Sequence, residues 1–144
     1  MTNESPPNVW VSLTIMGGSF DPDLVTAKLG VEPTSHYRAG DSIKDGKGRR
    51  RSDRWRVTIG PRETLKIDTM LSELLTHVAP GEDKLLAVCT ELGVEATLTC
   101  AVEPTSALTP YILFPSDVIR WAADHDVEID VDVMLWREEN DDDV

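Results

Sequence analysis

The most unusual group of chemically active side chains is a basic segment over residues 44–56. It holds seven of the fourteen Lys and Arg residues of the chain, against two aspartates. Five of the seven are arginines, whose planar guanidinium groups can hold a carboxylate or a phosphate through two parallel hydrogen bonds. The segment could therefore bind a compact anion or an acidic patch on a protein. The alternative is a solvated loop. The candidate binding residues are Arg49, Arg50, Arg51, Arg54 and Arg56.

A second candidate is a row of carboxylates near the C-terminus, formed by Glu128, Asp130 and Asp132. If this segment is a strand, alternate side chains share one face and stand about 7 Å apart. Such a row could hold a cation or a basic partner. It does not suggest an acid/base pair, because that pair needs two carboxyl groups in different environments. The alternative is a solvated outer face of a sheet.

Catalytic and metal-binding motifs are not evident in the sequence. Cys89 lies in an apolar run without an adjacent His, so its thiol is expected to be packed and inert. Cys100 lies in an alternating segment, and both thiols are expected to be reduced. The turn at residues 17–19 precedes a helix but lacks the Lys-Ser/Thr of a phosphate-binding loop. We therefore expect no catalytic residue, no cofactor and no metal. The three histidines are not spaced as metal ligands: His36, His77 and His125.

The overall charge limits the classes of partner. The formal net charge is −12 and the pI is near 4.5, so phosphate backbones and anionic membranes should repel the chain. No apolar run approaches the roughly 20 residues of a membrane helix, and residues 1–8 carry no apolar leader segment. We expect a cytoplasmic protein whose partner is another protein or a compact anion. A homodimer that pairs the basic segment with the carboxylate row is an open alternative.

The hydrophobic pattern predicts one domain over residues 9–137, after a disordered start at 1–8 and before an acidic, disordered tail at 138–144. Apolar residues at every second position predict four strands. In the last of these we expect Val127, Ile129, Val131, Val133 and Leu135 to face the core, with the carboxylate row outward. Residues 33–53 contain little apolar content and are expected to form a long loop. The expected strands begin near Val9, Trp55, Val94 and Val127.

Helices are expected between these strands. Asp21-Pro22 is typical of a helix start and Gly30 of a helix end. The other expected helices cover residues 64–78, residues 83–92 and a segment opened by Pro115. The resulting order is strand, helix, strand, two helices, strand, helix, strand. This order predicts an α+β fold with a ferredoxin-like split βαβ sheet and an extra helical pair between its two halves.

Several short motifs resemble the uncharacterised domain-of-unknown-function family 4279. They are Phe20-Asp21-Pro22-x-x-Val25, Leu29-Gly30-Val31-x-Pro33-Thr34, Gly40-Asp41, Trp55 and the stretch from Phe114 to Val133. The resemblance spans roughly residues 9–135. It implies the α+β class and the domain boundaries, and it carries over no activity and no site residue. Some small intracellular families of this kind act as antitoxins or immunity proteins, which is an analogy only.

Three functions are consistent with these observations. The first is a non-enzymatic protein-binding module, for which an immunity protein or an antitoxin is the example. The second is a small enzyme that holds an anionic substrate through the arginines of residues 44–56. The third is a structural protein that associates with itself through exposed strand edges. A deep pocket joining arginines to a histidine or carboxylate would favour the enzyme, whereas a flat charged surface would favour the binding module.

Overall fold

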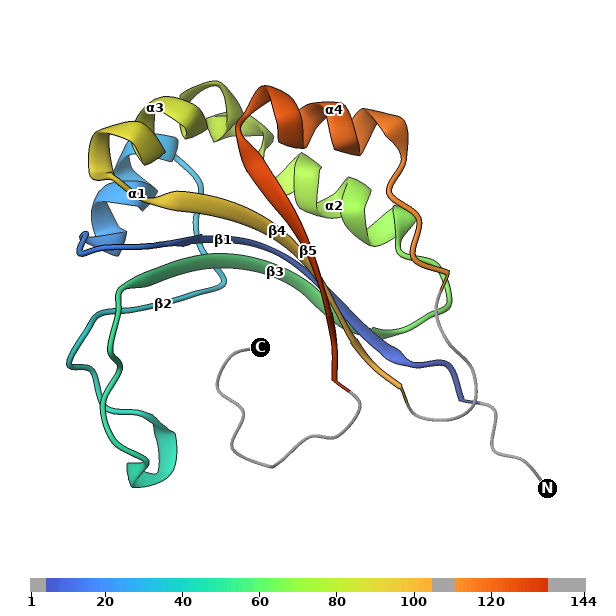
Figure 1. The fold of residues 1–144 in the computed structure, drawn as a ribbon, viewed down its shortest axis with the longest axis horizontal. Helices are drawn as coiled ribbons and strands as arrows, with labels where there is room; N and C mark the ends of the chain where they lie inside the picture. The colour runs from blue at the N-terminus through green and yellow to red at the C-terminus, as the bar shows by residue number, and fades with distance from the viewer. Residues whose placement is uncertain (1–4, 105–110, 135–144) are drawn as a thin grey trace.

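A computed structural model describes residues 5–104 and 111–134, and these form one mixed sheet with helices on one side (Figure 1). The strands of the sheet lie in the order β2-β3-β1-β4-β5. The strands are β1 (Asn8–Met16), β2 (Ser35–Tyr37), β3 (Arg54–Glu63), β4 (Glu95–Glu103) and β5 (Val127–Val133). The helices are α1 (Pro22–Leu29), α2 (Asp68–Val78), α3 (Glu82–Leu92) and α4 (Ser116–Asp124), with short 3-10 turns at Lys44–Gly46 and Ala79–Gly81.

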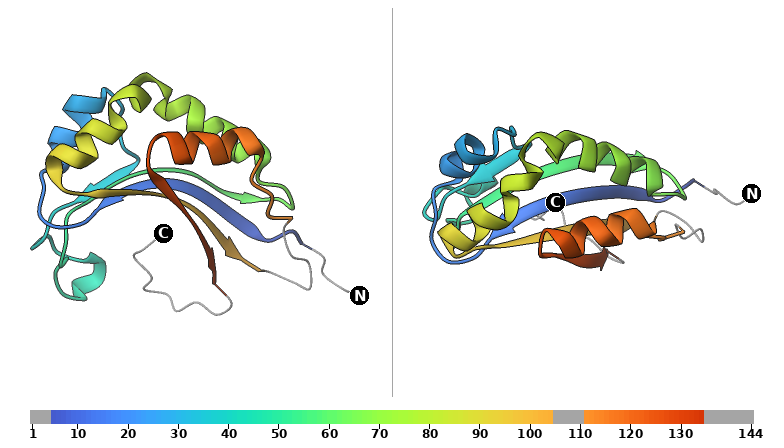
Figure 2. Two further views of the ribbon diagram at one scale, coloured as in Figure 1. Left: turned by 45° about the horizontal axis from the view of Figure 1, so that its top comes forward. Right: turned by 90° about the horizontal axis from the view of Figure 1, so that it is seen from above.

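The core lies between the helices and the convex face of the arched sheet (Figures 1 and 2). β1 is the central strand, antiparallel to both β3 and β4. Its alternate apolar side chains are fully buried, as the period of two predicts. On the other side of the core, α2 contributes Leu71 and Leu74, each with no exposed surface. The concave face of the sheet carries no described helix. The buried apolar residues of β1 are Val9, Val11, Leu13 and Ile15.

The expected helix boundaries are confirmed at α1. The side chain of Asp21 accepts a hydrogen bond from the backbone N of Asp23, and Pro22 occupies the first turn. At the other end Gly30 adopts φ 69° and donates to the carbonyl of Thr26, which closes the helix in a left-handed conformation that favours glycine. Trp55 packs below this helix with no exposed surface, and its indole N donates to the Thr26 hydroxyl at 3.0 Å.

The α+β class and the helical pair α2–α3 are confirmed, but the ferredoxin-like split βαβ arrangement is not. In a split unit, another strand separates the two strands that a helix connects. Here β4 and β5, connected by α4, pair directly and in parallel over seven residues. β1 and β3 are also direct neighbours. The pairing of β1 with β3 and of β4 with β5 therefore differs from the predicted one. Two other connections do cross a strand, since β3 lies between β1 and β2, and β1 lies between β3 and β4.

The predicted long loop at residues 33–53 contains one short strand and one 3-10 turn, and backbone hydrogen bonds order part of the remainder. Ser35–Tyr37 forms β2 on the outer edge of β3. The chain then makes a hairpin, in which the amide of Gly40 donates to Arg50 and the amide of Arg50 donates to Asp41, at 2.9 and 2.8 Å. We call residues 38–53 the basic hairpin. These hydrogen bonds join backbone groups of polar residues, so the sequence shows no apolar alternation from which they could be predicted.

The predicted inward face of the last strand is also mostly wrong. Val127 is buried, but Ile129, Val131 and Val133 are 38%, 43% and 48% exposed. β5 is the edge of the described sheet, and beyond its beginning the strand runs away from α4 (Figure 1). The register places these side chains beside buried residues of β4, on the helix-bearing face. Leu135, residues 1–4 of the predicted N-terminal segment and the predicted tail at 138–144 lie outside the described residues.

Truncation of one side chain on β4 and of one on β5 tests whether the apolar side chains of β5 lie outside the core. Leu98 and Ile129 are neighbours in the β4–β5 register, but Leu98 has no exposed surface. We expect Leu98→Ala to lower the free energy of unfolding by about 2–5 kcal/mol, since it leaves a cavity in the core. Ile129→Ala should cost about 1 kcal/mol or less, because the side chain is already partly in water. Urea unfolding of both variants measures the difference. Equal losses would contradict the exposed position of β5.

Candidate functional site

The basic hairpin does not present a row of free arginines. The guanidinium carbons of Arg50 and Arg54 lie 4.2 and 4.4 Å from the ring centroid of Tyr37, which is the geometry of cation–π contacts. Arg54 is only 4% exposed, so the prediction that it forms part of an open binding surface is wrong. Arg49 donates to the carbonyl of Gly40 at 2.8 Å and braces the hairpin. Arg49 and Arg51 remain exposed.

Two clamps hold the basic hairpin against the start of α1. The buried carboxylate of Asp53 accepts from the backbone N of Phe20 at 2.9 Å and of Ala39 at 2.8 Å. Arg38 donates to the carboxylates of Asp21 and Asp23 at 2.6 and 2.7 Å. The hydrogen bond from Arg38 lowers the pKa of Asp21, and hydrogen bonds to Asp23 and Asp21 raise the pKa of Arg38. The charges of the hairpin therefore serve largely to position it.

A shallow groove on the concave face brings Arg56 together with two residues of the carboxylate row. Its volume is about 140 Å³. The groups in and around the groove are tied into the sheet: Arg56 Nε donates to the Thr14 hydroxyl at 2.8 Å, and the Ser12 and Thr58 hydroxyls are 3.0 Å apart. No histidine or cysteine lines it. The lining residues are Trp10, Ser12, Arg56, Thr99, Ala101, Asp130 and Asp132.

β5 carries two exposed rows on its two faces. In the register with β4, Glu128 lies beside Thr97 and Asp130 beside Thr99, so the carboxylate row stands on the concave face next to threonines. All three carboxylates are exposed, as the sequence predicted. The opposite face carries the apolar row, which we define as Ile129, Val131 and Val133. The outermost strand of the described sheet thus combines an acidic row with an apolar row.

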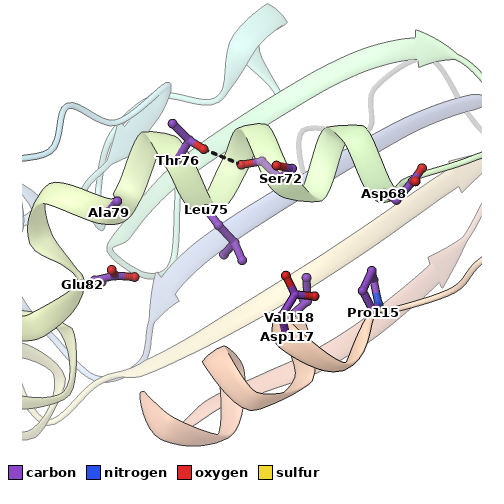
Figure 3. A pocket seen from close by; sticks show the side chains of 9 residues that line it. All are labelled: Asp68, Ser72, Leu75, Thr76, Ala79, Glu82, Pro115, Asp117 and Val118. Atoms are coloured by element: carbon purple, nitrogen blue, oxygen red, sulfur yellow. Dashed lines mark hydrogen bonds between the residues drawn. The ribbon is translucent and has the colours of Figure 1, made fainter.

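A second groove lies on the helix side, between α2 and α4 (Figure 3). Its volume is about 300 Å³, and the side chain of Leu75 points into it. Its polar groups are partly used within the fold, since Glu82 accepts from the indole N of Trp121 at 2.6 Å and Thr76 donates to the carbonyl of Ser72. Its charged lining residues, Asp68, Glu82 and Asp117, are all acidic. No histidine or cysteine is among its lining residues.

The two thiols, His77 and His125 take structural positions. Burial raises the pKa of Cys89 and of Cys100 to about 11, so both thiols are neutral near pH 7. His77 Nε2 lies 3.1 Å from the carbonyl of Glu32, and His125 Nδ1 lies 2.6 Å from that of Trp121. Within residues 5–104 and 111–134, no three His, Cys, Asp or Glu side chains gather as a metal site. In the same ranges no helix is long and apolar enough to cross a membrane.

Comparison with known proteins shows the family of the chain. A family model described as a domain of unknown function, DUF4279, matches residues 7–136. The chain belongs to this family. No curated protein and no solved structure matches the chain. The match runs from β1 through β5, so the basic hairpin, both grooves and both rows of β5 are parts of the DUF4279 domain itself.

Sequence reasoning missed two features of this DUF4279 surface. The first is the stacking of Arg50 and Arg54 on Tyr37. The sequence indicates this contact only by placing the three residues near one another in a polar stretch. The apolar row was assigned to the core, because alternation shows which residues share a face and not whether another element covers that face. Of the predicted arginines, the structure brings only Arg56 into a groove with the carboxylate row.

Removal of the Asp53 clamp should loosen the basic hairpin. Asp53→Ala leaves two backbone N–H groups without their acceptor, so we expect a loss of about 2 kcal/mol or more in the free energy of unfolding. Hydrogen exchange should speed up at the paired amides of Gly40 and Arg50. Asp53→Asn keeps one carbonyl acceptor and should retain part of the stability, and Lys47→Ala at the exposed turn is a neutral control. Unchanged exchange in Asp53→Ala would contradict the clamp.

The buried thiols should make the domain less stable at alkaline pH. The ordinary thiol pKa is 9.0 and the folded value is about 11. Between these values the unfolded chain releases protons that the folded chain keeps, so stability should fall as pH rises through this window and be unaffected by the thiols below it. The slope of unfolding free energy against pH should be shallower in Cys89→Ala/Cys100→Ala. Identical slopes in parent and variant would disprove the assignment.

Proposed function

We propose that this DUF4279 domain is a non-catalytic protein-binding module that docks its partner along the outer edge of β5. One observation carries the proposal: β5 ends the described sheet with its apolar row 38–48% exposed and its carboxylate row exposed on the other face. An open strand edge offers backbone N–H and C=O groups for pairing with another chain. Exposed apolar side chains beside that edge add surface that a partner would remove from water.

The contrast between the two edges of the sheet supports this choice. The β2 edge is short, with three residues, and it leads directly into the basic hairpin. Short and irregular edges are a common protection against unwanted pairing. β5 is seven residues long and keeps an unbroken register with β4, without a bulge. The protected edge is therefore β2, and the edge suited to a partner is β5.

The chemical state of the other candidate groups supports binding over catalysis. The two thiols are buried and neutral near pH 7, and two of the candidate arginines are stacked on Tyr37. These groups serve packing and positioning. We further propose a cytoplasmic location, since both cysteines are free thiols and a reducing compartment would keep them so.

Site-specific photocrosslinking tests the docking surface. A photoreactive amino acid replaces Val131 in one variant and Leu86, a residue of α3 with similar exposure of 45%, in a matched control. In cells that express the protein, we expect one protein to crosslink at position 131 and not at position 86. The purified partner should then bind Val131→Lys about tenfold more weakly than the parent, because a charge replaces an apolar contact.

Leu86→Lys should bind this partner like the parent, since it makes the same change on α3 and not on β5. Equal crosslinking at both positions, or full affinity in Val131→Lys, would show that the partner does not dock on β5.

A further inference from the structure

We infer that the segment docked on β5 is a basic extended strand, with Lys or Arg at every second position and apolar residues between them. This inference rests on the proposed function, because it takes the β5 edge as the docking surface. It adds the chemistry of the partner, which follows from the two rows that β5 presents. The segment would continue the sheet as a neighbour of β5, on the side opposite β4.

The register of the sheet determines what each side of the added strand would meet. Side chains directly opposite each other on neighbouring strands lie on the same face, with Cβ atoms about 4.5–5.5 Å apart. One face of the added strand would therefore meet the carboxylate row, and the other would meet the apolar row. Opposite charges across two strands stabilise the pair, and like charges destabilise it. A basic residue is thus the best match at each position facing Glu128, Asp130 or Asp132.

The carboxylate row is not neutralised by ion pairs within the described residues. The ion pairs there are Lys28–Glu91, Arg38–Asp21, Arg38–Asp23 and Arg62–Glu73, and none of them includes a residue of β5. In the concave groove, Arg56 is one cation near Asp130 and Asp132. The row retains an excess of negative charge on a chain whose formal net charge is already −12. A basic segment would therefore be attracted over a distance as well as in contact.

A second copy of β5 is a poor occupant of this edge. If two copies pair as antiparallel strands about a two-fold axis, the same face of each strand lies on the same side of the joint sheet. Glu128, Asp130 and Asp132 would then stand opposite the same three residues of the other copy. Six carboxylates would share one face, and like charges directly opposite each other destabilise a sheet.

The basic hairpin of a second copy also fits poorly. Its exposed Lys44 and Lys47 lie at the 3-10 turn, and the described hairpin contains a single isolated bridge, between Ser42 and Arg49. It does not present basic and apolar residues in alternation along an extended strand. The rows of β5 therefore favour a segment of a different protein.

A binding assay with synthetic peptides tests this inference. The probe is a seven-residue peptide in which Lys alternates with Val or Ile, and a second peptide carries Glu in place of Lys. A third peptide has the composition of the first, with its lysines gathered at one end. We expect the alternating Lys peptide to bind the parent protein, with new hydrogen-exchange protection at β5 amides, and the other two to bind at least about tenfold more weakly.

Charge reversal on β5 should reverse the preference. Glu128→Lys/Asp130→Lys/Asp132→Lys should lose at least about tenfold in affinity for the Lys peptide and gain affinity for the Glu peptide. Asp83→Lys/Asp117→Lys/Asp124→Lys is the matched control, because it makes the same change in net charge at exposed helix positions. This control should keep the preference of the parent. Equal loss in both triple variants would mean general charge attraction and would overturn the inference.

The outcomes separate this inference from the proposed function. If position 131 crosslinks a partner but the Lys peptide does not bind the parent, docking on β5 stands and the basic strand is wrong. If position 131 is not preferred in crosslinking and no peptide protects β5, the proposed function fails as well. If light scattering shows a parent dimer that Val131→Lys dissolves, the occupant is a second copy, and the inference is overturned.

Discussion

Burial of the apolar face of β1 is the constraint on which the rest of this domain depends. Val9, Val11, Leu13 and Ile15 are at most 1% exposed, and both neighbours of β1 pair with it along most of its length. The helices must lie on that face, since nothing else in the described chain can cover it. Their number and length then decide how far the cover extends. It reaches Val127 at the start of β5 and leaves the apolar row of that strand in water.

Positive and negative side chains have different roles in this domain. Arg38 bridges two aspartates at the start of α1. Arg50 and Arg54 stack on the ring of Tyr37. A cation that contacts an aromatic ring or a fixed carboxylate helps to hold the basic hairpin in place. The carboxylates of β5 have no such structural partners among the described residues. The acidic side of the domain is therefore the side better suited to an external ligand.

Much of the fold could be predicted from the sequence, and the failures have a common physical cause. The helix start at Asp21-Pro22, the stop at Gly30 and the apolar alternation of β1 are local signals, and each is confirmed. β2 was missed because backbone hydrogen bonds between polar residues leave no side-chain pattern. The exposure of the apolar row was missed because it depends on how far the helices cover the sheet, which the alternation of residue types does not show. Of the candidate surface, only the carboxylate row and the nearby Arg56 could be predicted from the residue types.

The one-sided pairing of β5 also affects how the domain moves. Every other long strand is bonded on two sides, whereas β5 is joined to the described sheet by β4 alone and is buried chiefly at Val127. A strand with few buried contacts and one ladder of hydrogen bonds opens at a lower free energy than the centre of a sheet. β5 can therefore detach more easily than β3, β1 or β4. Any molecule that pairs with the free side would also slow this local opening.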